Sequence, residues 1–347
     1  MRICTIRSLI GLLMLAGSAQ SQQIVDIFSN LESSDITLKG NMTDYGLQLD
    51  LISNGKVLQT GNLLLDGPGT YIAKWNNFQA EEGSYDACAS LVQNETVKSR
   101  ICYNFLIGGQ TPLRFDVRDV YADSKGMHLS ISATDPTIVD IYYMLAAGDK
   151  AIYVSREKAI PISGGFATPV KIDFPWKQIL NNDQEYTGRV KIVELNHNQT
   201  RAFQNAFIAT DDAIITETYQ DETGASATIL GNSRVPFEGK LRFTLSQNST
   251  VLTVVEQKTP VLLTGDDETV EISWNHTLEP GVYQLQTSLI GNNGDIRDEM
   301  ESIIDAKPMA KPVNTTQSEK KSPPPVASGF IALAAAAFLR YLRLKYK

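Results

Sequence analysis

Three tryptophans recur along the chain about one hundred residues apart, and each is followed by a tyrosine nine or ten residues later. The pairs are Trp75 with Tyr85, Trp176 with Tyr186, and Trp274 with Tyr283. Each pair lies in a block that reads as a strand into the tryptophan, a turn, a strand from the tyrosine, a polar tip and a return strand. Because a period of this length matches one small domain, we expect three copies of one unit.

Within each copy the apolar residues alternate with the period of a strand. Leu47, Leu49 and Leu51 alternate in the first copy, and the following Asn54-Gly55 is a strong signal for a type I′ hairpin turn. The third copy turns in the same way near Asn248. No stretch between the two ends of the chain has a sustained helical period. Short strands with turns every eight to twelve residues predict an all-β chain of antiparallel β-sandwiches.

The tyrosine motifs Gly83-Ser84-Tyr85 and Gly281-Val282-Tyr283 resemble those of immunoglobulin-like and fibronectin type III-like modules. The resemblance implies three tandem Ig-like domains, over residues 22–109, 110–211 and 212–305. It also implies a corner at which the tyrosine hydroxyl bonds back to the chain, although the second copy departs from the motif at Glu185. Because repeated aromatic residues inside strands usually pack the core, we expect the six tryptophans and tyrosines to be core residues instead of a ligand-stacking surface.

Cys88 and Cys102 both lie in the first copy, and the third cysteine, Cys4, falls in the N-terminal segment. Antiparallel pairing centred on Glu95 places the two opposite each other, on the outer and more polar face of a hairpin. Neither C-x-x-C nor the four-ligand spacing of a zinc site is present. In an exported chain these cysteines are therefore expected to form a structural disulfide and not a reactive or metal-binding pair.

The other copies have Arg189 and Gln286 at the position of Cys88, so the fold does not require the bond. Closing a loop of this size is expected to contribute about 3 kcal/mol. Reduction is therefore expected to destabilise the first copy and to leave the other two unaffected.

Residues 1–21 have the pattern of a secretory signal peptide. Arg2 and Arg7 precede an apolar run from Ser8 to Ala16, and small residues follow it up to Ser21. The apolar run is too short to span a bilayer comfortably, which favours cleavage over an uncleaved anchor.

The C-terminal end has a Pro/Lys/Thr-rich stretch at 306–325, typical of an extended stalk, and an apolar segment at 326–344 that predicts a transmembrane or sorting helix. A basic tail continues to residue 347 and predicts a cytoplasmic C-terminus. The basic residues of the segment and its tail are Arg340, Arg343, Lys345 and Lys347. The end is similar to the sorting signals of archaeal surface proteins of the PGF-CTERM type, and departs from them at Ser328, where the motif has proline. The resemblance implies that the tail is cleaved and replaced by a lipid; a retained single-span anchor is the other reading.

The chain is acidic, with a formal charge of −8 at pH 7, and its basic ends leave the middle more acidic still. This disfavours nucleic acid and anionic lipid head groups as partners of the middle. Six N-x-[ST] sequons predict N-glycosylation of an exported chain, at Asn41, Asn94, Asn198, Asn248, Asn275 and Asn314.

No pattern in the sequence nominates a catalytic centre or a cofactor. His128, His197 and His276 lie far apart in sequence, and no H-E-x-x-H, G-x-S-x-G, phosphate-loop or dinucleotide-binding motif occurs in a suitable setting. The acidic stretches 219–224, 264–271 and 291–295 lack EF-hand spacing, so solvated turns are favoured over calcium sites. We expect no metal, no cofactor and no enzyme activity.

These features predict an exported, membrane-anchored, non-catalytic surface protein that acts in adhesion, cell-envelope structure or binding. A docking subunit or assembly factor of a membrane complex is the alternative. The expected partners are the membrane, through the C-terminal helix or a lipid, and other surface proteins or glycans. Short linkers are expected between the copies, near 109–111 and 210–213.

Overall fold

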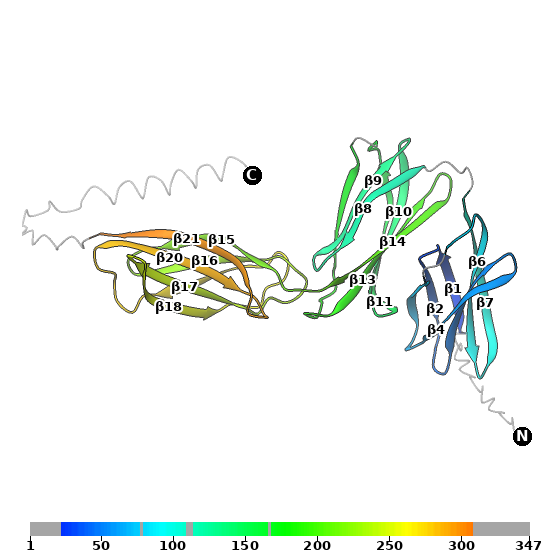
Figure 1. Ribbon diagram of the computed structural model, residues 1–347, viewed down its shortest axis with the longest axis horizontal. Coiled ribbons are helices and arrows are strands. Elements are labelled where there is room, and N and C mark those ends of the chain that lie inside the picture. Colours follow the sequence, from blue (N-terminus) through cyan, green and yellow to red (C-terminus); the bar gives the residue numbers. More distant parts are fainter. Residues whose placement is uncertain (1–21, 77–78, 109–113, 166–167, 308–347) are drawn as a thin grey trace, which may run out of the picture. The chain divides into compact units, whose positions relative to one another are not determined.

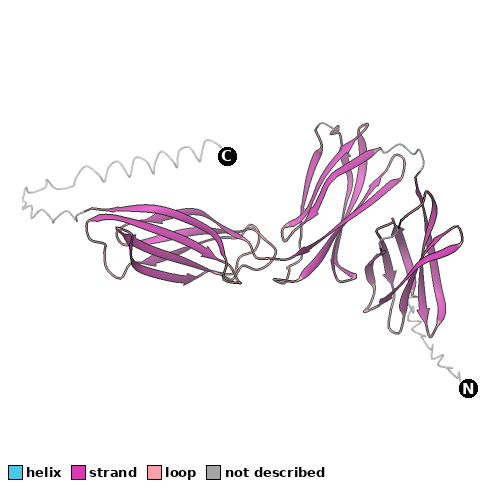
Figure 2. Ribbon diagram, viewed as in Figure 1, coloured by secondary structure: helices cyan, strands magenta, loops and turns pink. Residues whose placement is uncertain are grey.

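The described part of the chain is built entirely from strands, turns and loops. The computed structural model describes residues 22–76, 79–108, 114–165 and 168–307. Every regular element in these ranges is a β-strand in an antiparallel sheet (Figure 2), which confirms the all-β prediction. The predicted signal peptide, the expected linker at 109–111 and the predicted C-terminal helix lie outside them.

The first sandwich, strands β1 to β7, has two layers (Figure 1). One layer has the strand order β1-β2-β5, with β1 at Gln23–Ser29, β2 at Ser33–Lys39 and β5 at Gly69–Lys74. The other has the order β4-β3-β6-β7, with β3 at Gly46–Ser53, β4 at Lys56–Leu64, β6 at Gly83–Gln93 and β7 at Thr96–Ile107. Asn54 and Gly55, between β3 and β4, both have positive φ, as the predicted type I′ turn requires.

The second sandwich repeats this plan with strands β8 to β14. One layer is β12-β9-β8, with β8 at Phe115–Ala122, β9 at Gly126–Ala133 and β12 at Val170–Pro175. The facing strands are β11-β10-β13-β14, with β10 at Thr137–Ala147, β11 at Lys150–Ile162, β13 at Glu185–Glu194 and β14 at Gln199–Ile208.

The third sandwich repeats it again with strands β15 to β21. One layer is β15-β16-β19, with β15 at Ala213–Gln220, β16 at Gly224–Gly231 and β19 at Asp267–Ser273. The other is β18-β17-β20-β21, with β17 at Lys240–Gln247, β18 at Thr250–Lys258, β20 at Gly281–Ile290 and β21 at Ile296–Ala306.

Alternation along the strands gives each sandwich its own apolar core. Leu47, Leu49 and Leu51 are buried in the first core, because alternate side chains of β3 point to the same face. The six repeated aromatic residues are all buried, with Trp75 and Tyr85 in the first cluster, Trp176 and Tyr186 in the second, and Trp274 and Tyr283 in the third. Val235, which follows the predicted boundary at 211, packs in the second cluster, so the clusters do not divide cleanly there; the predicted boundaries at 109 and 211 stay predictions.

The first two sandwiches share a sheet. The order β1-β2-β5-β11-β10-β13-β14 runs through both, because the edge strands β5 and β11 pair at Tyr71 and Lys150. All described strands belong to one compact unit that ends at Ala306.

The predicted register of the cysteine hairpin is confirmed along most of its length. Cys88 lies opposite Cys102, and Tyr85 lies opposite Phe105. The prediction is wrong at the tip, where the register shifts by one residue after Leu91. A β-bulge there leaves a two-residue turn at Asn94-Glu95, both with positive φ, so the ladder from Gly83 to Leu91 is centred on Glu95 but the last two pairs before the turn are not.

Candidate functional site

Each sandwich carries the same turn between its first two strands. Asn30, Asp123 and Asp221 each accept hydrogen bonds, through Oδ1, from the backbone amides two and three residues further on, at 2.7–3.0 Å. We call residues 30–33, 123–126 and 221–224 the Asx turns. The backbone amide of each repeated tryptophan donates to the third residue of its turn. Sequence reasoning missed the Asx turns. The pattern N/D-x-x-[SG] before the second strand of each copy is the signal that could have found them.

The repeated tyrosines bond back to the chain that precedes them. Tyr85 Oη donates to the Glu81 carbonyl at 2.8 Å and accepts from the Glu81 amide at 3.0 Å. Tyr283 Oη donates in the same way to the Glu279 carbonyl, at 3.0 Å. Tyr186 differs, since its hydroxyl contacts the Gln184 side chain at 3.0 Å and accepts from the Asn181 amide at 3.1 Å. The copy that departs from the sequence motif is therefore the one with different partners.

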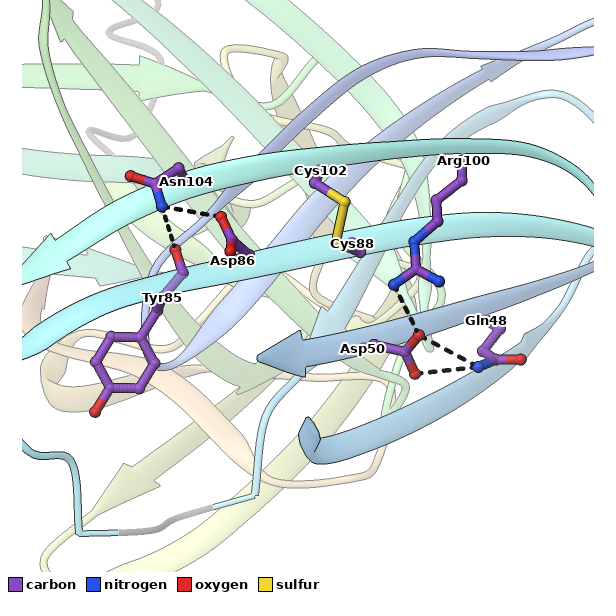
Figure 3. Close-up of a disulfide and its surroundings, with 8 residues drawn as sticks. All are labelled: Gln48, Asp50, Tyr85, Asp86, Cys88, Arg100, Cys102 and Asn104. Atoms are coloured by element: carbon purple, nitrogen blue, oxygen red, sulfur yellow. Dashed lines mark hydrogen bonds and ion pairs between the residues drawn. A yellow bond between two sulfur atoms is a disulfide. The ribbon is translucent and has the colours of Figure 1, made fainter. Parts of the chain in front are cut away.

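The disulfide between Cys88 and Cys102 is present, as predicted, between β6 and β7 (Figure 3). It lies on the face of the sheet away from the core, beside Asp50 on β3, whose carboxylate is 3.4 Å from the Arg100 guanidinium. Cys88 is nonetheless only 3% exposed. Cys102 is exposed, so the bond is covered on the Cys88 side and open on the Cys102 side, a placement that suits a surface brace.

The two residues in the position of Cys88 have different roles. Gln286 lies opposite Glu301 in the third sandwich and is half-buried. Arg189 in the second sandwich is completely buried, although it lies on the outer face of its sheet. The first sandwich covers it.

The partner of Arg189 is Asp35, on β2 of the first sandwich. Asp35 Oδ1 accepts from Arg189 Nη2 at 2.8 Å and from Nε at 3.1 Å, and Arg189 Nη1 also donates to the Ser33 hydroxyl. Asp35 Oδ2 accepts from Lys191 Nζ at 2.6 Å. We call Ser33, Asp35, Arg189 and Lys191 the Asp35 cluster; all four are buried. Sequence reasoning placed Arg189 correctly in the repeat but did not find the cluster.

The connection between the second and third sandwiches is also bonded. Asp211 is buried, its carboxylate accepts from Arg297 Nη2 at 2.7 Å and from the Asn292 amide at 3.0 Å, and its own amide donates to Asn182 at 3.2 Å. Asp212 contacts Lys125 of the second Asx turn at 3.2 Å. The expected linker at 210–213 is therefore fixed to both neighbours and is not a free spacer.

All five sequon asparagines in the described ranges are exposed, and Asn314 lies outside those ranges. Asn94, Asn198 and Asn248 lie in hairpin turns with positive φ. Asn41 accepts from the amide and hydroxyl of Thr43, at 3.0 and 2.6 Å. The positions are open to modification.

Two of the three histidines, His128 and His197, lie close to acidic side chains. His128 Nδ1 is 2.6 Å from Asp173, its Nε2 is 3.4 Å from Asp123, and its ring stacks on Tyr121. His197 lies 3.3 Å from Glu194. Within the described ranges no group of three or more His, Cys, Asp or Glu residues could hold a metal ion. Asp221 and Asp266, in two of the acidic stretches, accept hydrogen bonds from turn amides.

Glu194 is a buried acid with a structural task at the β13–β14 tip. Burial raises the pKa of its carboxyl, but hydrogen bonds from Thr137 at 2.5 Å and from the His197 and Asn196 amides outweigh burial and leave the pKa below its usual value. The charged form therefore holds the hairpin turn that contains Asn198.

The predicted anchor residues Arg340, Arg343, Lys345 and Lys347 lie outside the described ranges. Among the described residues, no helix has the length and apolar character needed to cross a bilayer.

No protein-family model matches the chain, and no curated protein matches it. Among solved structures, trypsin-activated alpha-2-macroglobulin from Escherichia coli aligns with 83% of this chain at 13% identity and a TM-score of 0.22. The alignment covers 24% of the macroglobulin, so this chain spans about a quarter of that structure. A tetra-tandem repeat from the extending region of a large adhesion protein aligns with 82% of this chain, and with 74% of its own, at 12% identity and a TM-score of 0.25. The fold assignment rests on the strands and registers above.

Proposed function

We propose that this chain is an exported, membrane-anchored and glycosylated surface protein that acts without catalysis, in adhesion, cell-envelope structure or binding. The observation that carries the proposal is where the buried charges are used. Asp35, Arg189 and Lys191 join the first sandwich to the second, and Asp211 holds the connection to the third. Buried ionisable groups at active sites face a cleft, whereas these four charged residues pair with each other or with neighbouring residues and so connect the sandwiches.

The sandwiches are proposed to be Ig-like. Support comes from the tyrosine hydroxyls of Tyr85 and Tyr283, which bond back to the carbonyl four residues earlier. This is the corner that the Ig-like resemblance implies. Folds of this kind serve many roles, so the fold supports a scaffold without naming its ligand.

Glycosylation and membrane attachment are proposed from the sequence. The exposed sequons at hairpin turns are compatible with attached sugars, which would keep those tips from contacting protein partners. The acidic middle of the chain argues against nucleic acid as a partner. The anchor, a helix or a lipid, is proposed at residues 326–344, with the sandwiches outside and the C-terminus cytoplasmic.

Mass spectrometry of the mature protein tests the anchor. A C-terminus that ends at Lys347 identifies a retained helix, and a chain that ends before residue 326 and carries a lipid identifies the sorted class. A chain that ends before the helix and carries no lipid, and that fractionates without membranes, would count against the surface role.

A docking subunit or assembly factor of a membrane complex is the alternative. The full chain, pulled down from detergent extracts, would then return one stoichiometric membrane partner. Binding to glycans or cells without such a partner supports adhesion. Hydrolase activity that is lost on a single substitution, such as His128→Ala, would overturn the non-catalytic proposal.

A further inference from the structure

The junction of the first and second sandwiches starts from two paired backbones. The Ile72 amide on β5 donates to the Asp149 carbonyl at 2.7 Å, and Lys150 is paired with Tyr71 in the ladder. Lys150 Nζ also contacts Asp66 at 2.7 Å. Since two edge strands cannot slide past each other without breaking these bonds, the sheet itself sets the register of the junction.

Apolar side chains close the junction around the charges. Ile72 of the first sandwich forms a buried cluster with Met144 and Ala146 of the second. The Lys191 ammonium lies 5.4 Å from the Phe28 ring centre of the first sandwich and 5.2 Å from the Tyr142 ring centre of the second. Water is thereby kept from the Asp35 cluster, and its ion pairs act at low dielectric.

The cluster holds one carboxylate against two cations. Arg189 donates to one carboxylate oxygen of Asp35 and Lys191 donates to the other, so both oxygens are paired. The nearest second acid is Asp26, 3.6 Å from Lys191 and 62% exposed. Loss of Asp35 would leave two buried cations with only this exposed partner, whereas loss of Arg189 would leave a balanced pair.

Both sides of the cluster differ from the equivalent positions of the other copies. Gly126 and Gly224 end the second and third Asx turns, where an added Cβ would lie 2.2 Å from a backbone oxygen; the same position in the first turn is Ser33. The position of Arg189 holds a different residue in each copy, Cys88 in the first and Gln286 in the third. Ser33 and Arg189 bond to each other across the junction.

We propose that the first and second sandwiches form one rigid body, and that its opening is controlled by the single carboxylate of Asp35. The two sandwiches then do not behave as independent modules on a linker. This inference goes beyond the proposed function and does not depend on it, because a rigid pair is compatible with either a surface protein or a docking subunit.

Hydrogen exchange of the full chain, followed by mass spectrometry, tests the proposal. Asp35→Asn is expected to speed exchange of peptides from β5 and β10, which carry Ile72 and Met144, by about tenfold or more. The reason is that removing the single carboxylate leaves two buried cations without their buried partner. Arg189→Met is expected to speed it less, because the Asp35–Lys191 pair survives. Ser33→Gly, which restores the glycine of the other turns, is expected to have the smallest effect. Peptides from β16 to β21 should be unchanged in all three.

The matched control is Asp50→Asn, which removes the charge of a buried carboxylate that pairs with the exposed Arg100, on the opposite sheet of the first sandwich. It should speed exchange in β3 and β6 and leave β10 as in the wild type. The proposal is overturned if Asp35→Asn affects β10 no more than this control does, or if Arg189→Met affects it as much as Asp35→Asn. If Asp35→Asn does not fold, the other two variants decide. The proposal is then overturned if the β5 and β10 peptides exchange at the wild-type rate in both Arg189→Met and Ser33→Gly.

Discussion

Cys88 and Arg189 occupy the same place in two successive sandwiches, three residues after the corner tyrosines Tyr85 and Tyr186. Cys88 is bonded covalently to Cys102, opposite it in its own hairpin. Arg189 lies opposite Gln204 in its own hairpin, but its side chain bonds to Asp35 in the preceding sandwich. One position thus supplies a bond within a copy in one case and between copies in the other.

The disulfide therefore affects more than the first sandwich. We expect Cys88→Ala/Cys102→Ala to lower the free energy of unfolding of the first sandwich by about 3 kcal/mol. The sequence alone predicts that the second sandwich is unaffected, but Arg189 loses its partner when the first unfolds, so the second should weaken too. Hydrogen exchange in denaturant measures both. A second sandwich with wild-type protection while the first is unfolded would contradict the expectation, and the third sandwich is the internal control.

The corner tyrosines are expected to stabilise the fold through their hydroxyls. Tyr85→Phe leaves the Glu81 amide and carbonyl without their partner and should cost about 1 kcal/mol of unfolding free energy, as should Tyr283→Phe. Urea titration measures both. Tyr219→Phe is the control, since Tyr219 is 66% exposed and its hydroxyl donates to the Asp221 side chain at 3.2 Å, not to the backbone. A cost equal to that of Tyr85→Phe would count against the corner.

Asp140 makes the second sandwich sensitive to acid. The Arg156 guanidinium beside it, and then the Ala159 amide at 2.8 Å, hold the pKa of the Asp140 carboxyl below its usual value. A folded-state pKa below the unfolded one adds stability that is fully present above about pH 4 and is lost as the pH falls through the folded value. The Tm gap between wild type and Asp140→Asn should therefore narrow from pH 6 to pH 2. A gap that is constant over this range would show that the charge is not involved.

Close packing at Gly188 predicts a large effect of a small change. An added Cβ would lie 2.4 Å from Ala122 Cβ and 3.2 Å from Met127 Cε, so Gly188→Ala should cost about 1–3 kcal/mol by overpacking the second core. Gly46→Ala is the control, because nothing lies within 4 Å of its added Cβ. Thermal melts of the two variants compare them directly, and equal Tm values would contradict the packing argument.

The parts of the fold that sequence could predict are those set by local patterns. Alternation placed the leucines of β3, and the Asn54-Gly55 turn set the register of its hairpin, because both depend on neighbours in the chain. The same logic paired Cys88 with Cys102. It missed the bulge after Leu91, because an extra residue in a strand leaves no distinct composition there.

The Asp35 cluster could not be predicted because its members are distant in sequence and look ordinary one by one. A charged residue on the outer face of a strand reads as solvent-exposed, and Arg189 does so until the first sandwich covers it. The repeat alignment contains two hints: Ser33 where the other copies have glycine, and Arg189 at a position that differs in all three copies. Only the fold shows that these two residues bond to each other.

The shared sheet has a consequence for how the chain tolerates rearrangement. In an array of self-sufficient repeats, a copy can be deleted, duplicated or exchanged with its neighbour. Here the second copy presents a buried guanidinium and ammonium that only the Asp35 face of the first copy neutralises. The third copy offers Ser226 at the position equivalent to Asp35, and so has no carboxylate there to replace it. The buried charges of the first two copies therefore fix which copy can precede which in the chain.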